Sequence, residues 1–266
     1  MENIASTLIP IMRKAGEIML SAGDVEGNGG ISEKGGDIAN LVTVYDVAVQ
    51  DFLMGEIRKA FPKACFIAEE KENESRLLGE EYCFIIDPID GTTNFIHGYC
   101  HSCISLALFS RGEAVFAAVY DPYLDEVFSA EKGKGAYLNG RKMSVSDRDA
   151  AHSIVAYGTS PYYKATLGEP TFRLCEELFM SCLDVRRCGS AALDLAYLAA
   201  GRNDMFFELM LSPWDIAAGY LLIKEAGGVM SDMQGREIDF SHPSPVLAAN
   251  PVAYPFLLEK AKEIVK

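Results

Sequence analysis

A continuous apolar run at residues 84–86 leads directly into two aspartates, Asp87 and Asp90. An unbroken run of this kind indicates a strand buried in the core, and such a strand constrains the sheet built around it. Asp-Pro and Asp-Gly pairs punctuate loops, so one interpretation of the next segment is a turn. A turn explains the two aspartates, but neither the two threonines that follow nor the rest of the chain. The carboxylates therefore need a chemical explanation as well.

Composition limits the class of protein that this chain can be and the kinds of partner that it can bind. The chain has 266 residues, 49% hydrophobic and 10% aromatic, which is enough for a packed core in one large domain or two modest lobes. Asp and Glu number 38 against 24 Lys and Arg, a formal net charge of −14. This balance argues against binding to a nucleic acid polymer and leaves cations as natural partners of a carboxylate cluster. Solubility alone explains an acidic surface equally well.

The amino terminus and the cysteines indicate the compartment. Arg13 and Lys14 interrupt the apolar pattern of the first helix, unlike a signal peptide, and no stretch reaches the roughly 18 apolar residues of a membrane span. The seven cysteines are odd in number and scattered, so we expect free thiols in a cytoplasmic protein. Cys100 and Cys103 have the spacing of a redox or metal half-site, but no second pair of matching spacing completes it.

The first part of the chain predicts two helices and an antiparallel sheet. Apolar positions near the helical period indicate a helix over 3–21, in which Pro10 is either a kink or a first-turn residue, and a second helix from about 44 to 61. The glycine-rich segment between them is either a solvated loop or a mobile flap. A short strand is expected at 64–70. From 102 to 146, β-rich runs joined by glycine turns indicate an antiparallel sheet.

The second part alternates strands and helices, which is typical of α/β layering. Strands are expected at 153–157, 184–189, 204–209, 228–232 and 245–250, and helices near 171–181, at 190–201, at 215–228 and at the carboxyl end. The boundary between the two parts falls near 146–152, without a linker long enough for independent domains.

Four acidic residues share a position at the end of an element. Glu69 ends one apolar strand, and Asp87 and Asp90 end a second. Asp215 stands at the mouth of a helix, three residues after Ser212. Sites are commonly built at such positions because the scaffold is rigid and the side chain projects freely. Each residue also has a structural interpretation, since Glu69 fits a solvated loop and Asp215 fits a capping box with Ser212 as the N-cap.

Two motifs together resemble a known family. DPIDGTTNF at 87–95 and WDIAAGYLLIKEAGG at 214–228 are similar to the paired signatures of the inositol monophosphatases, which are Mg²⁺-dependent, lithium-sensitive phosphomonoesterases. Supporting segments stand in order along the chain: LVTVYD at 41–46, FIAEE at 66–70, GKGAYLNG at 133–140 and GSAALDLAYLAAG at 189–201. The resemblance covers nearly the whole chain.

The resemblance implies a fold of alternating layers, an αβαβα sandwich of α+β and α/β character like that of inositol monophosphatase and fructose-1,6-bisphosphatase. An N-terminal α+β lobe, residues 1–148, would hold the antiparallel sheet and most metal ligands. A C-terminal α/β lobe, residues 149–266, would supply Asp215 and substrate contacts. The two lobes are expected to form a single structural unit, and a homodimer is expected because relatives are often dimers.

Hydrolysis of a phosphate ester explains the need for carboxylates. A phosphate monoester is a dianion that repels hydroxide, so the site must gather positive charge and make water a nucleophile at neutral pH, and metal ions do both. Mg²⁺ prefers hard oxygen ligands. By resemblance, a first ion takes Glu69, Asp87 and the main-chain carbonyl of Ile89. A second takes Asp87, Asp90 and Asp215, and a third, looser ion uses Glu69 and water, so two to three Mg²⁺ are expected.

The segment between the aspartates has its own predicted role. Pro88, with its fixed φ, is expected to turn the chain so that Asp87 and Asp90 converge. Without metal such carboxylates repel one another and some keep their protons, so stability is expected to depend on cations.

The residues after the aspartates predict a seat for the phosphate. Gly91 and Thr92 stand at an expected helix start, where backbone N–H groups point outward and a glycine lets an anion approach. By resemblance, the Thr92 hydroxyl acts in a hydrogen-bonded chain with Glu69 and Asp46 to orient and deprotonate the metal-bound water. A threonine at a helix start is otherwise a cap.

Substrate contacts are inferred from the resemblance alone. They are Asp90, Gly91, Thr92, Gly189, Ser190, Ala191, Glu208 and Asp215. This chain departs from relatives at Met210, where a glycine is common, and at Cys100 and His101, where proline and an aromatic are common. Both departures are expected near the rim of the substrate pocket, so the identity of the alcohol in the substrate ester stays open. Lys34 resembles a lysine that shields the metal site, although its spacing to Asp46 is one residue long, and an ordinary exposed lysine is the alternative.

The expected activity is Mg²⁺-dependent hydrolysis of a small phosphate monoester, first of all myo-inositol monophosphate, by in-line attack of metal-activated water. The same chemistry on fructose 1,6-bisphosphate, histidinol phosphate or 3′-phosphoadenosine 5′-phosphate is the alternative. The sequence TTN after Gly91 favours the inositol-type branch over the nucleotide branch, which tends to carry TKEF. A further class is a non-catalytic protein that binds divalent cations, although the ligand spacing of an EF-hand is absent. Neither a nucleic acid polymer nor a membrane is expected as a partner.

Overall fold

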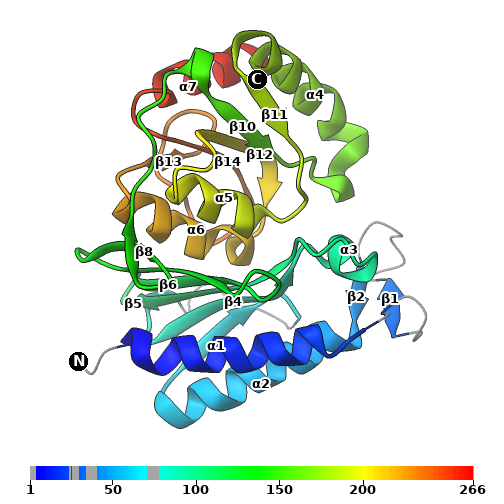
Figure 1. Ribbon diagram of the computed structural model, residues 1–266, viewed down its shortest axis with the longest axis vertical. Helices are drawn as coiled ribbons and strands as arrows, with labels where there is room; N and C mark the ends of the chain where they lie inside the picture. Colours follow the sequence, from blue (N-terminus) through cyan, green and yellow to red (C-terminus); the bar gives the residue numbers. More distant parts are fainter. Residues whose placement is uncertain (1–3, 24, 26–29, 34–40, 71–77, 266) are drawn as a thin grey trace.

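The computed structural model describes residues 4–23, 25, 30–33, 41–70 and 78–265. Its elements stack as five layers in the order helix, sheet, helix, sheet, helix (Figure 1). The helices are α1 (Ile4–Leu20), α2 (Val44–Ala60), α3 (Thr92–Ile96), α4 (Lys164–Ser181), α5 (Ala191–Ala199), α6 (Pro213–Glu225) and α7 (Tyr254–Ile264), with 3₁₀ turns η3 (Ala150–His152) and η4 (Pro161–Tyr163). This arrangement is the αβαβα sandwich that the sequence predicts.

The first sheet has seven strands and is covered on both faces. In spatial order they are β3 (Cys65–Ala68), β4 (Cys83–Asp90), β5 (Cys103–Ser110), β6 (Glu113–Asp121), β7 (Glu126–Glu131), β8 (Gly135–Leu138) and β9 (Arg141–Met143). Only the β3–β4 pair is parallel, so the predicted antiparallel sheet is confirmed. Phe84 and Ile86 of β4 pack with α1 and α2, whereas Ile85 packs with α5 and α6. Burial on both faces explains the unbroken apolar run.

The second sheet has five strands. In spatial order they are β11 (Asp184–Arg186), β10 (Ile154–Tyr157), β12 (Met205–Leu211), β14 (Ser244–Ala249) and β13 (Val229–Ser231). The first three run parallel, and β14 is antiparallel to both of its neighbours. One face packs on α4 and α7 and the other on the α5–α6 layer. Seven of the nine residues of α5 are buried, as expected for a helix between two sheets.

Three predictions about the helices and loops change. Pro10 lies inside α1, beyond its first turn, so the first-turn interpretation is wrong. Helix α4 begins at Lys164 instead of near 171, because η4 leads straight into it and the helix is already formed before Pro170, which removes only one backbone hydrogen bond. Part of the glycine-rich segment forms β1 (Ile31–Glu33), which pairs with β2 (Leu41–Thr43). Lys34 lies outside the described residues.

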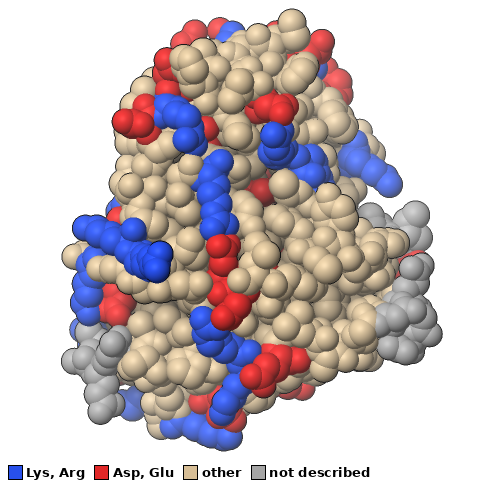
Figure 2. Space-filling model, viewed as in Figure 1, with Lys and Arg blue, Asp and Glu red and all other residues tan. Residues whose placement is uncertain are grey.

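The two sheets fall on either side of the predicted division at residue 148. They share a core, because Ile85 of the first sheet and Phe206 of the second belong to one cluster of buried side chains with α5 and α6. Among the described residues, no helix combines the length and the apolar character that a membrane crossing requires. On the face shown in Figure 2, acidic and basic side chains are interspersed.

Candidate active site

The two aspartates lie within β4, which does not end before them. Asp87 pairs with Ser105 and Asp90 pairs with Cys103, so β4 has one residue more than β5 over this interval. Residues three apart in a regular strand face opposite sides, and the extra residue of such a bulge reverses that alternation. Pro88 has no N–H for the ladder and is tolerated at a bulge. The predicted turn at Pro88 is therefore wrong, and a β-bulge takes its place.

Gly91 joins β4 to α3 and packs against two other loops. Its φ of 89° is left-handed, and a Cβ at this position would lie 3.1 Å from the carbonyl oxygens of both Gly189 and His101. Only glycine combines this backbone conformation with so close an approach. The predicted helix start is confirmed, with Gly91 rather than Thr92 as the N-cap.

Thr92 links the bulge to the buried Asp46. The Thr92 hydroxyl lies 3.2 Å from the carbonyl oxygen of Ile89 and 3.4 Å from Asp46 Oδ1. Asp46 is fully buried at the start of α2, and its Oδ2 accepts hydrogen bonds from the N–H of Thr43 at 2.8 Å and from the Thr43 hydroxyl at 2.5 Å. Burial outweighs these donors and raises the pKa of Asp46 to about 7.

Asp215 serves both as a cap and as a member of the acidic group. Its Oδ2 accepts a hydrogen bond of 2.7 Å from the N–H of Ser212, as the capping interpretation predicts. Asp87, Asp90 and Asp215 each also offer an oxygen within 4.8 Å of the other two. The helix cap therefore holds the Asp215 carboxylate beside the aspartates of β4.

Asp90 is held by the start of α5. The hydroxyl of Ser190 and the N–H of Ala192, the latter at 2.8 Å, both donate to its Oδ2. These donors stabilise the charged form, but burial outweighs them and raises the pKa of Asp90 to about 6. Residues one hundred positions apart in the chain thus meet at a single carboxylate.

Nearly all of the predicted site residues line one cavity of about 690 Å³. Those that line it are Glu69, Asp87, Ile89, Asp90, Gly91, Thr92, Gly189, Ser190, Ala191, Glu208 and Asp215. Asp46 is connected to this cavity through Thr92. Glu69 follows β3 directly, is half-buried, and its charge is among the causes that raise the pKa of Asp87.

Comparison with known proteins decides the family. The model of the inositol monophosphatase family matches residues 1–266. This chain belongs to that family. Nus factor SuhB of Escherichia coli K12 is 40% identical over 240 residues, which cover 90% of this chain and 88% of that protein. The inositol-1-monophosphatase of Mesorhizobium japonicum is 39% identical over 227 residues, 84% of each. The solved Thermotoga maritima IMPase has a TM-score of 0.86 at 32% identity, covering 97% of this chain and 96% of that one.

The acidic group fits the hard, oxygen-binding cation that the inositol monophosphatase family implies. Burial raises the pKa values of Asp87 and Asp215 well above the usual range, and repulsion from Asp90 raises both further. Three convergent carboxylates with no soft ligand among them match the preference of Mg²⁺ for oxygen. A bound divalent cation would offset the repulsion that the folded chain imposes on these groups.

Glu208 of β12 contributes a further buried carboxyl to the cavity. Its Oε1 accepts hydrogen bonds from the N–H of Ser160 at 2.8 Å and from the Ser160 hydroxyl at 3.2 Å. Burial raises its pKa to about 7. A Cβ on Gly158 would lie only 1.8 Å from Glu208 Oε2, so any side chain at this position would displace the Glu208 carboxylate. Neither Gly158 nor Ser160 was predicted as a site residue, and a glycine just after an expected strand was the one signal for them.

Without metal, the folded protein is expected to lose stability as the pH rises from about 4 to about 7. Asp46 and Glu208 have folded-state pKa values of about 7, against ordinary values of 3.8 and 4.5. Between those limits the folded chain binds more protons than the unfolded chain, so its free energy of unfolding falls with rising pH. Urea unfolding in the presence of a chelator at about pH 5 and about pH 8 measures this. The change should shrink in Glu208→Gln, and a free energy that rises over the interval would contradict the assignment.

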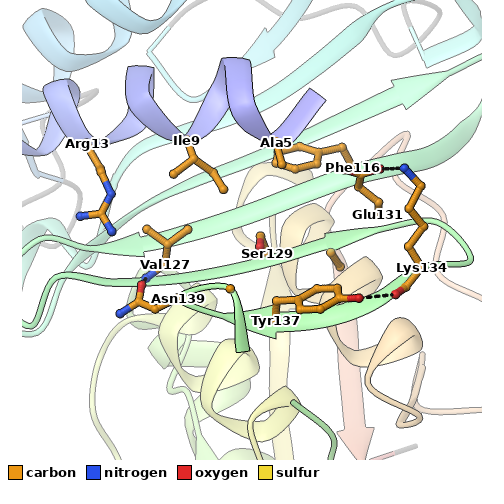
Figure 3. Close-up of a pocket in the computed structure, with 12 residues that line it drawn as sticks. Ala5, Ile9, Arg13, Phe116, Val127, Ser129, Glu131, Lys134, Tyr137 and Asn139 are labelled. Carbon is orange, nitrogen blue, oxygen red and sulfur yellow. Dashed lines mark hydrogen bonds and ion pairs between the residues drawn. The ribbon is translucent and has the colours of Figure 1, made fainter. Parts of the chain in front are cut away.

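A second cavity of about 480 Å³ lies between α1 and strands β6 to β8 (Figure 3). Ile9, Phe116 and Val127 supply an apolar wall, and Glu131 and Lys134 form an ion pair at its edge. Neither of the two potential metal-binding groups found among the described residues lies there. The acidic cavity is therefore the candidate active site of this inositol monophosphatase family member.

Proposed function

We propose that this chain is a Mg²⁺-dependent phosphatase of small phosphate monoesters, with myo-inositol monophosphate as the first candidate substrate. The observation that carries the proposal is the convergence of Asp87, Asp90 and Asp215, whose oxygens lie within 4.8 Å of one another in a large cavity. Family membership supports the reaction class. The substrate itself rests on the resemblance of the motifs.

The residues that would hold the ions follow the same resemblance. Glu69, Asp87 and the carbonyl oxygen of Ile89 are proposed for one Mg²⁺, and Asp87, Asp90 and Asp215 for a second, with a looser third ion beside Glu69. The Ile89 carbonyl oxygen lies 3.2 Å from the Thr92 hydroxyl, and when that hydroxyl donates to Asp46 instead, both lone pairs of the carbonyl oxygen are free for a cation. Bound Mg²⁺ would supply positive charge for the phosphate dianion and lower the pKa of water.

Thr92 and Asp46 are proposed to manage the proton of the attacking water. The Thr92 hydroxyl donates toward Asp46 Oδ1 and can at the same time accept a hydrogen bond from water in the cavity. A proton that reaches Asp46 meets a carboxyl with a pKa of about 7, which is suited to a general base near neutral pH. Glu69, which lines the same cavity, is proposed to help orient this water.

Backbone and carboxyl groups at the rim are proposed to bind the substrate. Gly91 and the small residues 189–191 line the cavity, and their backbone N–H groups are proposed to contact the phosphate. Asp90 and Asp215 are proposed to contact substrate hydroxyls besides the metal. Glu208 is proposed as a further substrate contact, because it lines the cavity and a carboxylate can accept a hydrogen bond from a polyol.

Gly158→Ala is expected to impair substrate recognition and leave the metal site in place. The new Cβ would overlap the Glu208 carboxylate, which must leave its hydrogen bonds with Ser160. A displacement of about 1 Å costs about 10²-fold in kcat/KM, here mainly through KM. Steady-state kinetics with the preferred ester measure this. Gly168→Ala, whose Cβ meets nothing within 4 Å, is the control, and equal kinetics for both variants would contradict the role of Glu208.

Phosphate release from a panel of esters tests the proposed substrate. Inositol 1-phosphate, fructose 1,6-bisphosphate, histidinol phosphate and 3′-phosphoadenosine 5′-phosphate would be compared by kcat/KM with Mg²⁺ present. We expect the highest value for inositol 1-phosphate. Fast turnover of the nucleotide with none of inositol phosphate would reject the first choice and keep the reaction class.

A non-catalytic role is the second candidate function. The observation that favours it is the 40% identity to a protein that carries the name Nus factor rather than phosphatase. An absence of phosphate release from every ester, with Mg²⁺ binding intact, would select this candidate. The homodimer and the cytoplasmic location stay predictions.

A further inference from the structure

A second group of potential metal ligands lies beside the acidic cavity. His101, Cys188 and Asp194 each offer one ligand atom within 4.8 Å of the other two. They come from three segments, namely the loop before β5, the loop after β11 and the middle of α5. Neither His101 nor Cys188 lines the acidic cavity, whereas Asp194 does. The group is therefore adjacent to the proposed Mg²⁺ site and shares none of its ligands.

Two atoms of this group are buried without a hydrogen-bond partner among the described residues. They are Nε2 of His101 and Oδ1 of Asp194. The Asp194 side chain is only 2% exposed, and a buried polar atom without a partner costs about 1–3 kcal/mol. Because so few buried polar atoms are left unpaired in folded proteins, each one needs an explanation. Here the two atoms belong to residues of the same cluster.

Two neighbouring side chains, Asn94 and Tyr197, hold the segments that carry the cluster. The amide of Asn94 donates to the carbonyl oxygens of His101 at 2.7 Å and of Cys188 at 2.8 Å, which ties the two loops together. The His101 ring packs edge-on against Tyr197, one turn after Asp194 on α5, with ring centroids 6.0 Å apart. The cluster is thus built into ordered structure at each of its members.

We propose that His101, Cys188 and Asp194 form a binding site for a borderline-soft divalent cation of the Zn²⁺ type, separate from the Mg²⁺ site. One imidazole, one thiolate and one carboxylate suit Zn²⁺, which accepts nitrogen, sulfur and oxygen ligands, whereas Mg²⁺ takes oxygen alone. Three protein ligands leave one tetrahedral position for water or another small ligand.

The electrostatic surroundings agree with a cation at this point. Burial raises the pKa of Asp194 well above its usual range, and Asp90 and Glu208 raise it further, whereas Arg187 and a hydrogen bond with the Cys188 side chain lower it only in part. Burial lowers the pKa of His101 and so keeps the imidazole neutral, the form that binds metals. Burial and Asp194 raise the pKa of Cys188 to about 11, so binding would release the thiol proton to solvent.

Such a site would be coupled to the acidic cavity through α5. Asp194 lies one helical turn after Ser190, whose hydroxyl donates to Asp90. Gly91 packs against the carbonyl oxygen of His101, which would lie only 3.1 Å from a Cβ at position 91. An ion that fixes His101 and Asp194 would therefore restrain both the loop beside Gly91 and the donor of Asp90.

Cobalt is the probe that separates this site from the Mg²⁺ site. We expect Co²⁺, added to the reduced protein in excess Mg²⁺, to produce the near-ultraviolet charge-transfer absorption of a cobalt–thiolate bond, and Zn²⁺ to abolish it. Oxygen ligands alone produce no such band. Absence of the band from the folded wild-type protein would overturn the proposal without any variant.

Variants identify the ligands. Cys188→Ser should abolish the band, and Asp194→Asn and His101→Phe should each weaken Co²⁺ binding by at least about 10-fold. Cys182→Ser is the matched control, because Cys182 is likewise half-buried with a pKa raised to about 11, and it should keep the band. Circular dichroism checks that each variant is folded. A band lost in Cys103→Ser and kept in Cys188→Ser would place the thiolate beside Asp90 and overturn the assignment.

Discussion

Asp90→Asn is expected to remove nearly all phosphatase turnover and to leave the protein folded. The carboxylate is one of three oxygen donors that converge in the cavity, and an amide offers a cation one neutral oxygen in place of a negative charge. Loss of an outer partner of a metal ligand costs about 10–100-fold, so loss of a ligand should lower kcat/KM by at least about 100-fold. Phosphate release at saturating Mg²⁺ and a thermal melt are the two measurements.

Ser190→Ala is the matched control for Asp90→Asn. It removes one donor to Asp90 Oδ2 while the N–H of Ala192 still holds the carboxylate, so a loss of about 10-fold is expected. A folded Asp90→Asn protein with wild-type turnover would refute the assigned site. Turnover that is absent even from the wild-type protein would select the non-catalytic function instead.

Mg²⁺ is expected to stabilise the wild-type protein strongly and Asp215→Asn hardly at all. An ion that binds only the folded state adds about 2.7 kcal/mol at 100 times its Kd and about 4.1 kcal/mol at 1,000 times. Asparagine keeps an oxygen for the N–H of Ser212, so the cap survives, but it removes a charge from the buried group. Without metal, Asp215→Asn should therefore be the more stable protein, because repulsion with Asp90 is gone.

Melting temperatures of the wild-type protein and of Asp215→Asn, with a chelator and with increasing Mg²⁺, measure whether Mg²⁺ reverses the order of their stabilities. Asp147→Asn, which removes an exposed carboxylate, should show the wild-type response. If Asp215→Asn gained as much from Mg²⁺ as the wild-type protein, Asp215 would not be a ligand.

Local patterns predicted most of the helices and strands, and the family resemblance implied their arrangement in layers. The apolar run at 84–86 indicated a strand buried in the core, and the structure shows helices on both sides of β4 that bury it. The glycine turns between 102 and 146 indicated the antiparallel strands. The β-bulge between Asp87 and Asp90 was not predictable, because it depends on how β4 pairs with β5, and pairing register is a tertiary property. Pro88 was interpreted as a turn residue, whereas in the structure it lies in the bulge, where a residue without an N–H is tolerated.

The residues of the candidate sites likewise fall into those that the sequence predicted and those that only the structure revealed. Asp87, Asp90 and Asp215 belong to motifs that can be recognised in sequence, and the structure brings them together. Gly158 is required by the Glu208 carboxylate fifty residues later, and Asp194 lies on a helix that reads as apolar core. Neither follows a local rule, because Glu208 meets Gly158 only when β12 pairs with β10, and His101 and Cys188 meet Asp194 only in the folded chain.

A crystal structure with Mg²⁺ and phosphate tests the central claim most directly. We expect two or three ions whose ligands include Glu69, Asp87, Asp90 and Asp215, with phosphate seated against Gly91 and Thr92. Ions bound elsewhere, or a phosphate far from these carboxylates at saturating Mg²⁺, would contradict the account.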